Sequence, residues 1–148
     1  PLRTMDDVES LRAGLADGTI DAVATDHAPH AAHLKDQDLA AAPPGMLGLQ
    51  SALGVALAHS GCSPRRIVEA MSWIPARIAG LDASHGRDVA PGEPANIVVF
   101  ATEGVWRQTI ESIVSKSTNS PYFDVDLVGG VRHVVHRGEV VVAGGVAK

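Results

Sequence analysis

The first part of the chain alternates between a helical pattern and a strand pattern. Apolar residues recur over 8–15 at the spacing of one buried helical face, and Thr4 and Asp7 before them resemble a capping box. Gly18 is a suitable helix stop, and the mostly apolar run 20–25 after it predicts a short buried strand. A helix, a tight turn and a buried strand form an αβ unit, the repeating element of parallel-sheet folds.

Further helices are predicted in the next stretch. Residues 49–57 carry apolar side chains on one helical face. Ser63 and Pro64 then provide an N-cap residue and a proline at the first helical position, which is a strong helix start. The pattern predicts a separate short helix over 75–79, ended by Gly80.

The pattern changes to short strands after these helices. A stretch rich in glycine and proline precedes an apolar run at 96–100, which predicts a strand. The runs 131–136 and 139–143 flank an Arg-Gly pair and predict a β-hairpin. We therefore divide the chain into a helical part with one strand, 1–80, and a mainly β part, 81–148.

Composition and charge narrow the class of protein. The 148 residues are 45% hydrophobic and 20% charged, which is typical of a globular domain. A net charge of −5 disfavours nucleic acid or an anionic membrane as a partner. The single cysteine, Cys62, excludes an intrachain disulfide and any multi-cysteine zinc site. Without a secretion signal or an apolar run long enough to span a bilayer, we expect a reducing, cytoplasmic setting.

Polar side chains gather directly after the predicted strand. Asp26, His27, His30 and His33 follow its C-terminal end, where ligands bind in α/β folds. Carboxylate oxygen and imidazole nitrogen are ordinary zinc ligands. Spacing alone leaves two interpretations open, a metal site or a solvated, hydrogen-bonded loop. This loop would not complete a metal site by itself, because an extended Asp-His pair points its side chains apart.

The residues around this loop resemble a known family. Thr25-Asp26-His27-Ala28-Pro29-His30 is similar to a signature of dihydroorotases, members of the cyclic amidohydrolase group. The resemblance extends in order along nearly the whole chain. Further segments that carry it are Pro1-Leu2-Arg3, Asp17 to Asp21, Pro44 to Leu49, Pro75 to Leu81, Pro91 to Asn96 and Ser117 to Pro121.

The resemblance implies a zinc-dependent hydrolase of cyclic amides that interconverts dihydroorotate and N-carbamoyl-aspartate in pyrimidine synthesis. One or two zinc ions would activate a water molecule, and Asp26 would bind a metal and carry the proton from that water to the leaving nitrogen. By the same resemblance, His30 would bind the substrate carboxylate, and backbone groups of Pro44 and Gly45 would contact the pyrimidine ring. His27 is expected to be a hydrogen-bonded or packing residue, and Lys35 to be solvated.

The implied fold class is α/β. Residues 1–80 would form the C-terminal end of a metal-dependent (β/α)8 TIM barrel, and 81–148 a mainly β segment of the composite amidohydrolase β-sandwich. The family's remaining metal ligands, including its His-x-His pair, and the substrate-binding Arg and Asn would lie upstream of this chain. We therefore expect the chain to be a C-terminal fragment that is inactive by itself.

Other interpretations remain open. A hydantoinase or allantoinase is the nearest enzyme alternative, but its substrates lack the carboxylate for which His30 would be reserved. A non-catalytic dihydroorotase-like protein associated with aspartate transcarbamoylase is an alternative from another class, and a homo-oligomer is compatible with either. A small α+β binding domain is the third, and it leaves the strand at 20–25 without partners.

Overall fold

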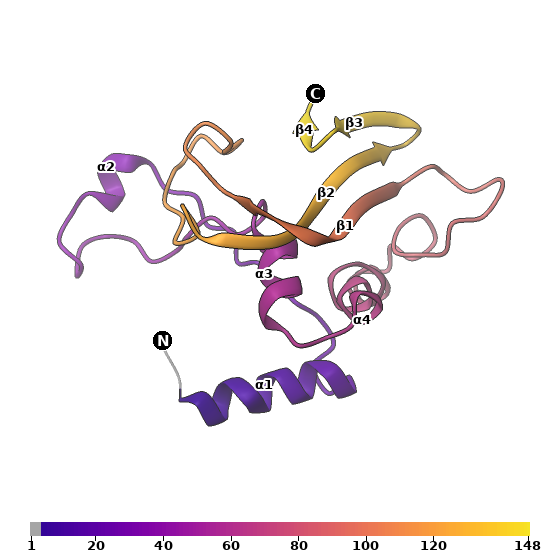
Figure 1. The fold of residues 1–148 in the computed structure, drawn as a ribbon, viewed down its shortest axis with the longest axis horizontal. Coiled ribbons are helices and arrows are strands. Elements are labelled where there is room, and N and C mark those ends of the chain that lie inside the picture. The colour runs from indigo at the N-terminus through magenta and orange to yellow at the C-terminus, as the bar shows by residue number, and fades with distance from the viewer. Residues whose placement is uncertain (1–3) are drawn as a thin grey trace.

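Helix α1 (Met5–Asp17) has both ends that the sequence predicts. In the computed structural model, which describes residues 4–148, the Thr4 hydroxyl accepts from the Asp7 backbone amide and the Asp7 carboxylate accepts from the Thr4 amide. Gly18 ends the helix in the left-handed conformation, with φ of 89°. None of the α1 residues is buried, and Met5 and Leu11 are 65% and 58% exposed. Figure 1 shows α1 at the edge of the molecule, away from the sheet.

The segment 20–25 is not the strand that the sequence predicts. It pairs with no other strand within residues 4–148, and two of its amides donate to carbonyl groups elsewhere in the chain. The Ile20 amide donates to the Gly14 carbonyl oxygen at 2.8 Å, and the Val23 amide donates to the Ala70 carbonyl oxygen at 3.0 Å. A strand is defined by hydrogen bonds to a neighbouring strand, so an apolar pattern without such a neighbour gives only an irregular segment.

Helix α3 (Ala52–His59) is followed by a longer helical rod. The rod starts at α4 (Pro64–Val68), where the Ser63 hydroxyl accepts from the Arg66 amide as the sequence predicts. It continues without a break through one π-helical turn, η1 (Glu69–Trp73), into α5 (Ile74–Ile78). The prediction of a separate helix over 75–79 is therefore wrong. Pro75 lacks the amide that an uninterrupted α-helix would use, and the wider π turn just before it accommodates that loss.

The second part of the chain forms one antiparallel sheet in the order β1-β2-β3-β4. Its strands are β1 (Ile97–Arg107), β2 (Asp126–His136), β3 (Glu139–Ala143) and β4 (Val146–Ala147). The strand at 96–100 and the hairpin are confirmed, although β1 and β2 extend well beyond the predicted runs and β4 was not predicted. Helix α3 packs against β2 (Figure 1), where Gly54 lies against the fully buried Leu127.

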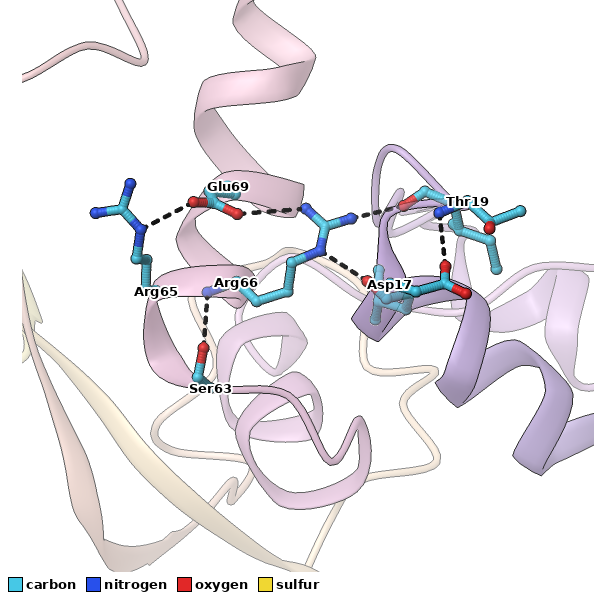
Figure 2. Close-up of polar contacts among 8 residues, drawn as sticks. Asp17, Thr19, Ser63, Arg65, Arg66 and Glu69 are labelled. Carbon is cyan, nitrogen blue, oxygen red and sulfur yellow. Dashed lines mark hydrogen bonds and ion pairs between the residues drawn. The ribbon is translucent and has the colours of Figure 1, made fainter.

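Arg66 connects α4 by hydrogen bonds to the end of α1 and to the segment that leads to Asp26. Figure 2 shows its guanidinium between Glu69 on one side and the end of α1 on the other. Nε donates to the Leu15 carbonyl oxygen and Nη2 to the Ile20 carbonyl oxygen, both at 2.7 Å. The Arg66 side chain is 12% exposed, so these charge-assisted bonds are shielded from water.

Replacing Arg66 by alanine should lower the free energy of unfolding by about 2–4 kcal/mol, because two carbonyl groups lose a charged donor in a partly buried place. Urea denaturation measures this loss. Arg65→Ala is the matched control. Its side chain is 76% exposed and pairs with Glu69 at 3.0 Å, so it should cost less than about 1 kcal/mol. Equal losses for the two variants would contradict the anchoring role of Arg66.

No helix within residues 4–148 has both the length and the apolar character needed to cross a bilayer.

Candidate active site

Asp26 stands at the end of the extended segment, where the chain turns sharply. Its φ of 45° lies in the left-handed region, which few residues other than glycine adopt. The side chain is exposed, and within residues 4–148 its carboxylate takes part in no hydrogen bond or ion pair. Strained backbone of this kind persists at sites where a side chain must be presented in one direction. Asp26 therefore offers a free carboxylate at a defined place.

His27 closes the base of the loop that begins at Asp26. Its Nδ1 accepts from the Gly48 amide at 3.1 Å and from the Leu49 amide at 3.3 Å, which makes Nδ1 the unprotonated nitrogen. The backbone adds a bridge between His27 and Met46. His27 is thus a hydrogen-bonded residue that supports the loop, in agreement with the sequence-based expectation.

His30, Pro44 and Gly45, which the sequence places in one site, are in direct contact. The His30 Nε2 lies 3.0 Å from the Pro44 carbonyl oxygen. Because a carbonyl oxygen only accepts, Nε2 carries the proton and donates. A Cβ atom on Gly45 would lie 3.1 Å from the same Nε2 and 2.6 Å from the Ala28 Cβ. The glycine backbone is therefore pressed against His30 with no room for a side chain.

Three residues that sequence reasoning did not assign to the site hold this contact in place. Lys35, expected to be solvated, is half-buried and donates from Nζ to the Gly45 carbonyl oxygen at 3.1 Å. Asn119 Nδ2 donates to that same oxygen at 3.0 Å. The Ser117 hydroxyl lies 2.7 Å from the His30 carbonyl oxygen. The polar run around Ser117 was visible in the sequence, but nothing there indicated which loop it meets.

The residues present can contribute to a metal site without completing one. No group of three or more His, Cys, Asp or Glu side chains within residues 4–148 is arranged to hold a metal ion. The unpaired Asp26 carboxylate is a suitable zinc ligand, and a catalytic zinc takes about three protein ligands. The residues present are therefore compatible with a metal site to which this chain contributes one ligand.

A cavity lies beside this site. It measures about 740 Å³, is mostly apolar, and lies between α3 and the sheet, where Leu53, Trp106 and Val131 are among its lining residues. Neither Asp26 nor His30 lines it. The candidate site is the surface formed by the loops 26–30 and 43–48, and the cavity adjoins it at His27, which also lines the cavity.

Comparison with known proteins identifies the class. The sequence profile of the Amidohydrolase family matches residues 2–141, so the chain belongs to that family. Two of its relatives are the dihydroorotases of Mycobacterium leprae and Mycobacterium tuberculosis, to which it is 46% and 45% identical over 97% and 98% of its length. The chain spans 34% of the length of each of these relatives.

Solved structures share the fold over the whole chain. A D-hydantoinase from Thermus sp. matches with a TM-score of 0.87, and an L-hydantoinase from Arthrobacter aurescens with 0.86. Both are 24% identical to the chain, which covers 34% of each of them. At this identity the likeness shows the fold alone, that of a fragment of a TIM-barrel amidohydrolase.

Proposed function

We propose that this chain forms part of the active site of a dihydroorotase, an enzyme that reversibly hydrolyses the cyclic amide of dihydroorotate to N-carbamoyl-aspartate. The observation that carries the proposal is the contact of His30 with Pro44 and Gly45, on the same loop as the free carboxylate of Asp26. Relatives at 40–46% identity bear the name dihydroorotase, which supports this substrate.

Asp26 is the proposed metal ligand and proton carrier. The metal is one or two zinc ions, which when bound would lower the pKa of a water molecule and polarise the amide carbonyl. The other ligands would come from residues upstream of this chain. The Asp26 carboxylate would take the proton of that water and pass it to the leaving nitrogen, which a carboxylate free of other partners is able to do.

His30 is proposed to bind the substrate carboxylate. The Nε2–H of His30 already donates to the Pro44 carbonyl oxygen, so the ring can donate to a carboxylate only from Nδ1. Donation from Nδ1 requires the imidazolium form, in which both ring nitrogens carry a proton. The charge of that cation would favour an anionic substrate over a neutral one. A neutral ring would instead have to break its hydrogen bond to the Pro44 carbonyl oxygen before its Nε2–H could donate to the substrate.

Gly45 is proposed to present its amide to the pyrimidine ring. The carbonyl oxygens of Pro44 and Gly45 are both already hydrogen-bonded, and Pro44 has no amide proton. Within residues 4–148 the Gly45 amide donates no hydrogen bond. It is therefore the backbone group of this pair that remains available to a carbonyl oxygen of the substrate.

The place of the chain in a larger enzyme is part of the same proposal. Residues 1–80 would be the end of the (β/α)8 barrel and 81–148 the C-terminal segment of the β-sandwich. The chain by itself would lack most metal ligands and would not turn over substrate.

The test is hydrolysis of dihydroorotate and of hydantoin by the full-length protein that contains this chain, with zinc supplied. We expect kcat/KM for dihydroorotate to exceed that for hydantoin by about 10⁴-fold, because the group that binds a carboxylate is left unpaired by a substrate without one. His30→Gln should reduce that preference, and His33→Gln, at an exposed residue of the short helix α2 (Ala32–Lys35), should leave it unchanged.

Each contrary outcome points to a different alternative. A preference for hydantoin would assign the protein to the hydantoinases. Absence of turnover of either substrate by the folded, zinc-loaded protein would favour a non-catalytic partner of aspartate transcarbamoylase.

A further inference from the structure

The turn at Pro44 and Gly45 is held by two side chains from different parts of the chain. Lys35 Nζ donates to the carbonyl oxygens of Pro43 at 2.9 Å and Gly45 at 3.1 Å, so one ammonium group bridges both ends of the turn. Asn119 Nδ2 reaches the Gly45 oxygen from the loop between β1 and β2, at 3.0 Å. Both lone pairs of the Gly45 carbonyl are therefore used.

Asn119 is itself held by further hydrogen bonds to its neighbours. Its backbone carbonyl oxygen accepts from the Leu47 amide at 3.0 Å, and its Oδ1 is in contact with the Ser117 hydroxyl. Ser117 is buried, and its hydroxyl also contacts the His30 carbonyl oxygen. The residues 117–119 thus connect the backbone of His30 to that of Gly45.

These contacts fix the two peptide planes on either side of Gly45. The plane before Gly45 contains its amide and the Pro44 carbonyl, which His30 holds. The plane after it contains the Gly45 carbonyl, which Lys35 and Asn119 hold. Glycine has the greatest backbone freedom of all residues, so without these partners the direction of its amide would be poorly defined.

We propose that Lys35 and Asn119 are positioning residues that preorganise the Gly45 amide and the His30 ring for binding of the cyclic amide substrate. The proposal rests on the proposed function, because it assigns these two residues to that same site. Neither side chain needs to touch the substrate. Their effect is to remove the cost of ordering the turn when the substrate binds.

The experiment combines kinetics with amide hydrogen exchange on the full-length protein. Lys35→Met and Asn119→Ala should each raise KM for dihydroorotate about tenfold, the loss expected for one hydrogen bond to a charged or well-fixed group. We expect kcat to stay within about threefold, because the turn contacts the substrate equally in the ground state and the transition state. Lys35→Arg, which keeps a cationic donor, should restore most of the affinity.

Hydrogen exchange tests, independently of activity, whether Lys35 and Asn119 hold the turn at Pro44 and Gly45; we call this pair of contacts the clamp. In both variants the hydrogen-bonded amides of residues 47–49 should exchange about tenfold faster than in the unchanged protein. Gln37→Ala is the control, since the Gln37 side chain donates to the carbonyl oxygen of His33 in α2 and forms no hydrogen bond to the turn. It should alter neither KM nor exchange at 47–49.

The outcomes separate this proposal from the proposed function. Unchanged exchange in Lys35→Met and Asn119→Ala would overturn the clamp, whatever the activity. Faster exchange with unchanged KM would overturn its role in binding the substrate. An unchanged protein that does not hydrolyse dihydroorotate would refute the proposed function and with it the role in binding, while the exchange data would still decide whether the clamp exists.

Discussion

Replacing Asp26 by asparagine should lower kcat for dihydroorotate by at least about 10³-fold, the upper range for losing a general acid–base group. Asparagine has nearly the same shape, so the sharp turn at φ of 45° is preserved, and asparagine tolerates that conformation. The amide, however, can neither carry a proton nor bind zinc with a negative charge. The measurement is steady-state turnover by the full-length protein.

Metal content and a matched variant separate the two roles of Asp26. Asp21→Asn changes an exposed carboxylate on the same segment and should leave kcat unchanged. If Asp26→Asn retains zinc but loses turnover, the proton-carrying role is the more important one. If kcat of Asp26→Asn stays within about tenfold of the unchanged protein, Asp26 is not the proposed general acid–base group.

Replacing Gly45 by alanine should reduce kcat/KM for dihydroorotate by about 10²-fold, because small displacements of positioning groups have effects of that size. Gly45 has φ of 129°, a conformation that residues with a side chain rarely adopt. The added Cβ would meet the Ala28 Cβ at 2.6 Å and the Ala28 carbonyl oxygen at 3.2 Å. The turn must therefore shift away from Ala28 and His30.

Gly18→Ala is the control for backbone strain alone. Gly18 has φ of 89°, but nothing lies within 4 Å of the position that its Cβ would take. This variant should lose about 1 kcal/mol of stability through the left-handed conformation and none of its activity. Similar kcat/KM values for Gly45→Ala and the unchanged protein would show that the turn does not contact the substrate.

The parts of the fold that the sequence predicts are those set by neighbouring residues. The capping of α1 by Thr4 and the start of α4 at Ser63 depend on side chains that bond to amides three positions away. The strand predicted at 20–25 failed because pairing depends on a distant partner that the apolar pattern does not contain. The rod through Pro75 was missed because a proline usually marks a helix start, and here a π turn lets the helix continue.

The candidate site shows the same limit. Asp26, His30, Pro44 and Gly45 were selected by a resemblance, and the contact of His30 with the Pro44–Gly45 turn is consistent with that selection. Asn119 was not selected, because its contact with Gly45 joins residues 74 positions apart. The sequence does not indicate which carbonyl group a polar residue in a long loop will bind.

The bond from Lys35 to the Pro43 carbonyl oxygen also has a consequence for insertions. This bond connects the two sides of the loop at Lys35 and Pro43, so residues 36–42 form a tip beyond it. Leu39 in this tip is 97% exposed. Lengthening a flexible tip costs little, about 0.6 kcal/mol for each doubling of its length. Natural variation in loop length, or an inserted peptide tag, can therefore be accommodated at the tip while Asp26 and Gly45 keep their places.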